Sequence, residues 1–254
     1  PTTAQAWAWG LNDRGSLGLG DTAVRSSPVQ IGTEAHWASL SASSPTTSGS
    51  AGVRTDGSLW TWGGNSHGGL GVGNTTNYSS PIQVGALTDW LQVAAGYKYM
   101  SGIKTDGTLW SWGRNYVGCL GLGDTVDRSS PVQVGALTTW LKATASYDVG
   151  GAIKTDGTLW MWGRGTYGAL AQGNTDNYSS PVQVGSLTTW ATLSSGYRFS
   201  LATTTDGKLY AWGYQGYGQL GVGNTTNYSS PVQVGALTTW ADISAGRNHS
   251  LAIK

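Results

Sequence analysis

The sequence is short of the residues on which several protein classes depend. Its 254 residues include one cysteine, Cys119, and one phenylalanine, so an intramolecular disulfide framework is excluded. Charged residues are sparse and nearly cancel, with 14 basic against 13 acidic, so no global field favours nucleic acid or a membrane surface. No apolar run approaches the roughly 18 residues of a membrane span, and the opening PTTAQAWAWG does not read as a signal peptide. We therefore expect neither membrane insertion nor nucleic-acid binding.

Glycine and tryptophan are abundant instead, and they recur with a fixed period. The chain has 40 glycines and 14 tryptophans, and the glycines lack the three-residue period of collagen. The dipeptide Trp-Gly occurs at intervals of 53, 50, 50 and 50 residues, with its tryptophan at Trp9, Trp62, Trp112, Trp162 and Trp212. Each copy also carries Ser-Ser-Pro and a later tryptophan, at Trp37, Trp90, Trp140, Trp190 and Trp240. Five copies of a roughly 50-residue repeat therefore span the chain.

Each repeat predicts four short antiparallel strands, which we name A to D in chain order. In one copy we expect A over residues 90–95, B over 100–104, C over 108–112 and D over 131–134. Proline cannot donate to a ladder, so strand D should lie at an outer edge. Four-stranded units of this period are typical of β-propeller blades, and the tryptophans should fill the layers between blades. We predict an all-β, five-bladed β-propeller forming a single domain over residues 1–254, in which Cys119 is a small buried filler.

The two ends of the chain each supply half a blade. Residues 249–254 predict a strand B with no turn after it, and residues 1–9 predict a strand C with no strand B before it. We expect strands A and B from the C-terminus to pair with C and D from the N-terminus. Such a split blade would close the ring of a monomeric protein.

The repeat resembles that of the regulator-of-chromosome-condensation propeller family. The stretch GYKYMSGIKTDGTLWSWGRNYVGCLGLGDT carries the resemblance, and the last copy, ISAGRNHSLAIK, is similar to the family's strand A–B segment. The resemblance covers all five repeats and implies the propeller fold. The family includes a nucleotide exchange factor for a small GTPase, secreted β-lactamase inhibitors and a plant ultraviolet photoreceptor. Its members typically have seven blades, and this sequence has five repeats with no insertion like the exchange factor's wedge.

Two windows of the repeat differ from copy to copy, while the B–C turns and D–A segments hardly change. One window follows Trp-Gly, between strands C and D; the other lies between strands A and B, and in the first copy it is lengthened around residues 43–48. In an antiparallel blade the A–B and C–D loops lie at the same end, so both windows should share one face. Diversified loops on a rigid scaffold are the usual layout of a recognition surface.

The composition of these windows favours protein recognition. They hold six basic residues against two acidic ones, and tyrosine and arginine are favoured at interfaces. We therefore expect a slightly acidic protein partner. The candidate binding residues are Arg14, His67, Tyr97, Lys98, Tyr99, Arg114, Tyr116, Tyr147, Arg164, Tyr167, Tyr197, Arg198, Phe199, Tyr214, Tyr217, Arg247 and His249.

Two further patterns receive a structural interpretation. Gly-Leu-Gly-Asp and Gly-Val-Gly-Asn precede coil and strand rather than helix, so we do not interpret them as phosphate loops. Asp21 and Asp124 are each followed four residues later by arginine, whereas Asn74, Asn174 and Asn224 are each followed by tyrosine. Because the two positions change together, we predict a contact inside this loop.

Catalysis has little support in the sequence, and other binding functions remain open. The three histidines lie in three different repeats, and no nucleophile elbow, metal-ligand cluster or close acid pair is present. We expect no enzyme activity, no cofactor and no bound metal. A lectin-like module with aromatic sites for glycans or small ligands is an alternative, but equivalent sites need equivalent residues and the two windows differ between copies. A scaffold component of a larger assembly is a third interpretation.

Overall fold

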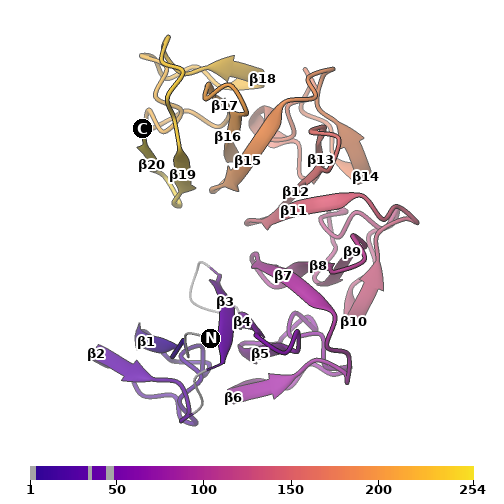
Figure 1. Cartoon of the computed structure of the whole chain (residues 1–254), viewed down its shortest axis with the longest axis vertical. Coiled ribbons are helices and arrows are strands. Elements are labelled where there is room, and N and C mark those ends of the chain that lie inside the picture. The colour runs from indigo at the N-terminus through magenta and orange to yellow at the C-terminus, as the bar shows by residue number, and fades with distance from the viewer. Residues whose placement is uncertain (1–3, 34–35, 44–48) are drawn as a thin grey trace. The chain divides into compact units, whose positions relative to one another are not determined.

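The computed structural model describes residues 4–33, 36–43 and 49–254 (Figure 1). The chain forms two compact units, the first made of residues 1–115 and 126–138 and the second of residues 116–125 and 139–254. Among the described residues, no helix is long and apolar enough to cross a membrane. The lengthened A–B window predicted in the first repeat falls mainly on residues 44–48, outside the described part.

In the described part of the chain, twenty short strands make up nearly all of the regular structure, with one 3₁₀ turn, η1 (Thr166–Gly168). The first unit contains β1 (Trp7–Gly10), β2 (Arg25–Gln30), β3 (Trp37–Ala42), β4 (Gly49–Arg54), β5 (Leu59–Gly63), β6 (Tyr78–Gln83), β7 (Trp90–Ala95), β8 (Tyr99–Lys104), β9 (Leu109–Gly113) and β10 (Arg128–Gln133). The second unit contains β11 (Trp140–Ala145), β12 (Val149–Lys154), β13 (Leu159–Gly163), β14 (Tyr178–Gln183), β15 (Trp190–Ser195), β16 (Phe199–Thr204), β17 (Leu209–Gly213), β18 (Tyr228–Gln233), β19 (Asp242–Ala245) and β20 (Ser250–Ile253).

The strands form antiparallel blades in sequence order, as predicted. Four sheets are complete, with orders β3-β4-β5-β6, β10-β9-β8-β7, β11-β12-β13-β14 and β15-β16-β17-β18. Strand D is the outermost strand of each. The ladder between β5 and β6 is irregular from the Gly63–Tyr78 pair to the Thr61–Ile82 pair, and Pro81 falls within this stretch. A bulge at a sheet edge is where a proline, which lacks an N–H, can be accommodated.

The remaining four strands form two half-blades. β1 pairs with β2 and β19 pairs with β20, each as a separate two-stranded sheet. The five repeats therefore supply all the strands of five blades, and the all-β propeller architecture is confirmed. Trp9 in β1 is 60% exposed, whereas its counterparts Trp62, Trp112, Trp162 and Trp212 are at most 3% exposed. Pairing of β20 with β1 to complete the fifth blade stays a prediction.

Tryptophans of several blades donate a hydrogen bond to the preceding repeat. The indole Nε1 of Trp162 donates to the backbone oxygen of Cys119 (2.9 Å). The buried Trp212 likewise donates to the oxygen of Ala169 (3.1 Å). A Cβ on Gly121, whose φ is +72°, would lie only 3.0 Å from Nε1 of Trp162, so the loop can approach the indole only as glycine. Cys119 is buried, as expected of a small filler.

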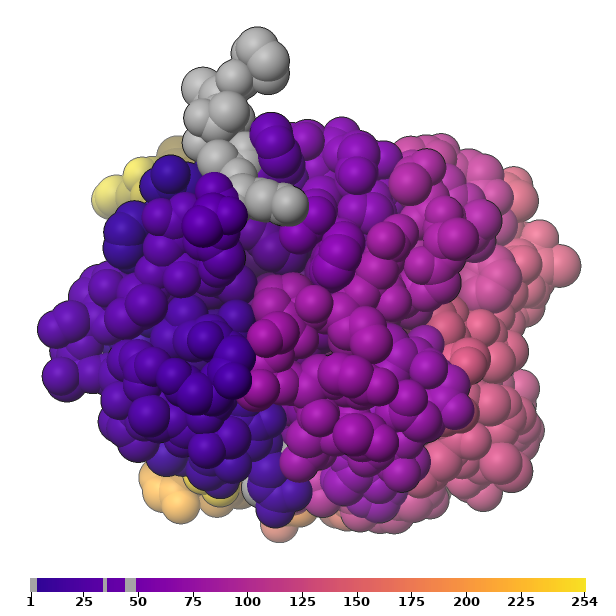
Figure 2. Space-filling model, turned by 90° about the horizontal axis from the view of Figure 1, so that it is seen from below, coloured from indigo at the N-terminus to yellow at the C-terminus, as the bar shows by residue number. Residues whose placement is uncertain are grey.

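Successive blades share hydrophobic cores because of this arrangement. In the first unit, Val53 and Leu59 of one blade pack in the same cluster as Trp90, Met100 and Trp112 of the next. Figure 2 shows one face of this unit, coloured indigo to magenta, in space-filling form. Burying so many large indoles is the main source of stability available to these short strands.

Candidate functional site

The A–B and C–D loops of one blade are joined by a backbone hydrogen bond that recurs in three repeats. The first amide of the C–D loop donates to the second carbonyl of the A–B loop, from Arg114 to Lys98 (2.9 Å), from Arg164 to Asp148 (2.9 Å) and from Tyr214 to Arg198 (2.8 Å). Lys98 and Arg198 have left-handed backbones, with φ of +64° and +63°. An ordinary side chain in this region is strained and is held there by its surroundings. In these blades the A–B loop is thus held against the C–D loop.

In the second unit, three successive repeats bring tyrosine and arginine side chains into one continuous cluster. We call it the tyrosine–arginine cluster and define it as Tyr147, Tyr167, Tyr197, Arg198, Tyr214, Tyr217 and Arg247. The rings of Tyr147 and Tyr197 meet edge to face, with centroids 4.7 Å apart. Arg198 bridges two repeats, because its guanidinium lies 4.6 Å from the Tyr197 ring and 5.4 Å from the Tyr167 ring.

The cluster continues on both sides of Arg198. The rings of Tyr167 and Tyr214 are 4.8 Å apart, and those of Tyr214 and Tyr217 are 5.9 Å apart. Desolvation, together with the neighbouring Tyr217 and Tyr167, raises the pKa of the Tyr214 hydroxyl, which keeps it a neutral donor. On the other side, the guanidinium of Arg247 lies 5.5 Å from the Tyr197 ring. Its backbone oxygen accepts the amide of Tyr197 (3.2 Å). These stacked contacts fix the rings relative to one another.

A buried carboxylate organises a second group of predicted residues beside this cluster. Asp148 is buried, and its Oδ2 accepts hydrogen bonds from the Tyr116 hydroxyl (2.8 Å) and from Nε of Arg164 (3.0 Å). The Arg164 guanidinium also lies 5.2 Å from the Tyr116 ring. Sequence reasoning did not select Asp148. The signal available was an acidic residue where the other repeats have Lys98, Arg198 or Asn248, with an arginine later in the same blade.

The predicted residues of the first unit are more dispersed. The cations of Lys98 and Arg114 lie 5.1 and 5.8 Å from the ring of Tyr97. His67 Nδ1 is 3.0 Å from Oδ2 of Asp127 in an exposed pair. Arg14 is exposed, and the structure shows no interaction of its side chain with the other predicted residues. In the second unit His249 is also exposed and lies against Gly246, outside the cluster.

Two predicted binding residues belong to the core, and the prediction is corrected for them. Tyr99 and Phe199 are both 1% exposed. Each is the first residue of a strand B, β8 or β16, rather than part of the loop before it. Phe199 packs with Leu201, Leu209 and Leu220. Because strand B begins earlier than expected, these rings point into the blade and not toward a partner.

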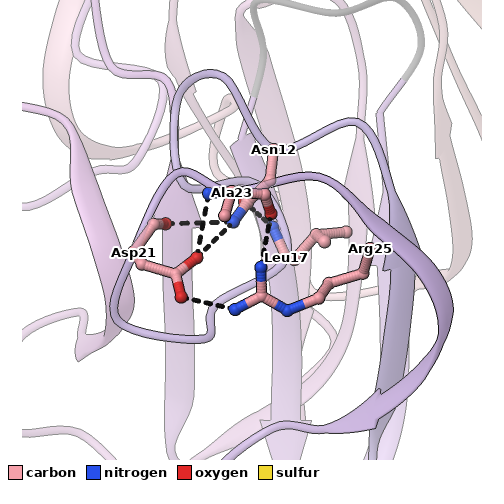
Figure 3. A network of polar contacts seen from close by, with 5 residues as sticks. All are labelled: Asn12, Leu17, Asp21, Ala23 and Arg25. Carbon is pink, nitrogen blue, oxygen red and sulfur yellow. Dashed lines mark hydrogen bonds and ion pairs between the residues drawn. The ribbon is translucent and has the colours of Figure 1, made fainter.

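Other positions of the C–D window are also structural. In Figure 3, Asn12 accepts the amide of Leu17 and donates to Asp21, which in turn accepts from Ala23 and Arg25. The bond from the Ala23 amide, followed by Arg25, lowers the pKa of Asp21. The predicted contact between residues four apart is confirmed here by the Arg25–Asp21 ion pair. It is also confirmed in the tyrosine version, in which Asn74, Asn174 and Asn224 donate to Tyr78, Tyr178 and Tyr228 at 2.8–3.1 Å.

Metal-binding clusters do not occur in the described ranges, where no three His, Cys, Asp or Glu side chains converge. The tyrosine–arginine cluster is made of aromatic rings and guanidinium groups. Such a surface offers stacking, hydrogen-bond donors and positive charge.

Comparisons with solved structures identify the fold. Human WBSCR16 superimposes with a TM-score of 0.86 at 19% identity, over 98% of this chain and 67% of that one. Yeast Prp20, from a structure of Kap60 bound to it, gives a TM-score of 0.84 at 20% identity, over 99% of this chain and 64% of that one. Another study of Prp20p from Saccharomyces cerevisiae describes its binding to Gsp1p and histones, with a TM-score of 0.83 at 16% identity.

Sequence comparison gives a consistent result. The X-linked retinitis pigmentosa GTPase regulator of Canis lupus familiaris is 42% identical over 83 residues, which is 32% of this chain and 8% of that protein. This chain thus spans a small part of that relative. The model of the regulator of chromosome condensation (RCC1) repeat matches residues 4–47, 56–101, 106–153, 156–203 and 206–253. The chain therefore belongs to the family of proteins built from regulator of chromosome condensation repeats.

Proposed function

We propose that this protein is a non-enzymatic recognition module that binds another protein through its A–B and C–D loops. The observation that carries the proposal is the tyrosine–arginine cluster, in which side chains from three repeats stack into one surface. Tyrosine and arginine are the types most often found at the energetic centres of interfaces. One relative supports the class of function, since Prp20 is described with Kap60, Gsp1p and histones.

The charge of the cluster favours an acidic partner. Arg164 is neutralised by Asp148, but Arg198 and Arg247 take part in none of the ion pairs found among the described residues. The Nε of Arg198 is also buried without a hydrogen-bond partner in the part of the chain that the structure describes. A carboxylate from a partner would satisfy this donor, and a bidentate contact would add geometric specificity. The differences between repeats favour one asymmetric partner over several identical ligands.

The experiment compares partner binding by matched charge variants. Proteins captured by the wild type from the source organism are identified, and the dissociation constant of each purified candidate is measured. The Arg198→Ala/Arg247→Ala variant should weaken a true partner by about 30-fold or more, the effect of losing a hot spot worth about 2 kcal/mol. The control Lys142→Ala/Lys208→Ala removes the same charge elsewhere in the second unit and should bind normally.

Salt dependence provides a second readout. If the partner presents carboxylates, its association rate with the wild type should fall as ionic strength rises, and less so with the double arginine variant. If the partners bind the double arginine variant as well as they bind the double lysine control, the recognition surface does not lie at this cluster.

A further inference from the structure

Away from the variable loops, the first unit holds an apolar groove of about 440 Å³. Its walls include Trp90 at the start of β7, Trp110 in β9 and Lys104 at the end of β8. Gln83, the exposed Leu87 and Pro131 also line it. This size and this mixture of indole, aliphatic and a few polar groups are those of a small-molecule site, for which volumes of about 300–1,000 Å³ are usual.

A buried cation holds the two aromatic walls in place. Lys104 is 5% exposed, and its Nζ lies 5.1 Å from the Trp90 ring and 4.5 Å from the Trp110 ring. It also forms an ion pair with Asp89, with Nζ 3.3 Å from Oδ2. The Trp90 and Trp110 rings themselves meet edge to face, with centroids 6.3 Å apart. The groove is therefore rigid, and its positive and negative charges neutralise each other.

One polar atom of the groove's lining lacks a hydrogen-bond partner inside the described part of the protein. This atom is the indole Nε1 of Trp90, which is buried. Buried polar groups in proteins are normally satisfied, by protein, water or ligand. A bound molecule that accepts a hydrogen bond would satisfy this donor.

We propose that the groove at Trp90 binds the ring of a neutral sugar. The C–H faces of a pyranose can pack against the indole walls, and a hydroxyl group can accept a hydrogen bond from the Trp90 indole. A charged ligand is disfavoured because Lys104 and Asp89 already neutralise one another. The site does not depend on the proposed protein partner, since none of its residues belongs to the variable loops.

The lysine and the two tryptophans of the groove recur in the next repeat, although Thr139 stands there in place of Asp89. In the second unit, Nζ of Lys154 lies 5.1 Å from the Trp140 ring and 3.8 Å from the Trp160 ring. The Trp140 indole is again buried without an acceptor among the described residues. Equivalent ligand sites require equivalent residues. The variable loops fail this requirement, whereas the lysine and the two tryptophans of this part of the repeat meet it.

The next repeat provides an internal control. Trp190 has the same unpartnered indole, but Thr204 and Tyr210 stand where the other repeats have lysine and tryptophan. The side chain of Gln172 also lies along β14, the strand D that precedes Trp190, and donates to the backbone oxygen of Gln183 (3.2 Å). Because the cation is missing and one wall is smaller, sugar binding should be weak or absent at Trp190.

The test follows individual indole N–H signals of the full chain in ¹H–¹⁵N correlation spectra. Methyl glycosides of glucose, galactose, mannose, fucose and N-acetylglucosamine are titrated separately. The signals of Trp90 and Trp190 are assigned with Trp90→Phe and Trp190→Phe. We expect at least one glycoside to shift the Trp90 signal in a saturable manner and to leave that of Trp190 in place.

Two matched substitutions then place the response in the groove. Leu87→Arg puts a long side chain at its rim and should abolish the shift at Trp90. Leu187→Arg alters the equivalent exposed leucine of the control repeat and should preserve that shift. The proposal is overturned if no glycoside moves the Trp90 signal, if Trp190 responds equally, or if the response survives Leu87→Arg. None of these outcomes bears on the tyrosine–arginine cluster, which is tested with protein partners.

Discussion

Replacing Trp162 by phenylalanine tests whether the tryptophan-to-carbonyl bonds between repeats stabilise the fold. Trp162 is fully buried, and its indole donates to the Cys119 oxygen at 2.9 Å. Phenylalanine cannot donate, so the substitution leaves a buried carbonyl without this partner, at a cost of about 1–3 kcal/mol. The smaller ring also buries roughly 40 Å² less apolar surface, which adds about 1 kcal/mol. We expect the free energy of unfolding of the second unit to fall by about 2–4 kcal/mol.

The matched control is Trp160→Tyr, two residues away on the same strand. The indole of Trp160 donates only to the nearby Thr158 hydroxyl (2.9 Å), and the next repeat already has Tyr210 at this position. We expect this change to cost less than about 1 kcal/mol. Urea unfolding followed by far-UV circular dichroism measures both variants without depending on tryptophan fluorescence. If Trp162→Phe is no more destabilising than Trp160→Tyr, the inter-repeat bond is not a major source of stability.

Two further predictions concern acid stability and ring closure. The Thr108 hydroxyl and amide lower the pKa of Asp106 below its ordinary value of 3.8, so the stabilisation is complete above that value and is lost as pH falls through the folded pKa. Asp106→Asn should therefore flatten the loss of stability below about pH 4 in urea unfolding at several pH values, and an unchanged acid limb would contradict this. For closure, we predict that β20 pairs with β1 in the register that β12 has with β13, where Gly151 stands opposite Met161. Ala8→Cys/Leu251→Cys, at the corresponding positions and in a Cys119→Ala background, should then form an intramolecular disulfide. Free thiols or covalent dimers on a non-reducing gel would be evidence against closure within one chain.

Much of the fold could be predicted because each structural feature of the repeat occurs several times in the sequence. Strand A of one repeat was predicted over residues 90–95, which are the observed bounds of β7. The loop contact between residues four apart was predicted because aspartate pairs with arginine and asparagine with tyrosine. A single repeat would not have shown this, since the information lies in the paired change.

The errors in the predicted binding residues arose where a shift of one residue in the start of a strand decides whether a side chain is buried. Strand B was expected to begin at Met100, but β8 begins at Tyr99. Since successive residues of a strand face opposite sides, that one position decides whether a tyrosine joins the core or the loop. Asp148 was overlooked for a related reason. Its charge is visible in the sequence, but its burial beneath Tyr116 and Arg164 results from contacts with two different repeats.

The residues that recur and those that differ imply two different kinds of binding. Positions that recur are those where each blade must pack against the next, as in the bond from Trp212 to Ala169. A ligand site built from them can be repeated with its indole donor in the same place, which suits a small molecule bound at more than one repeat. The A–B and C–D loops escape this constraint, so three repeats can contribute different residues to one surface, as Arg198 does between Tyr167 and Tyr197. A surface without internal repetition matches a single large partner, which is why we assign protein recognition to the variable loops and sugar binding to the constant groove.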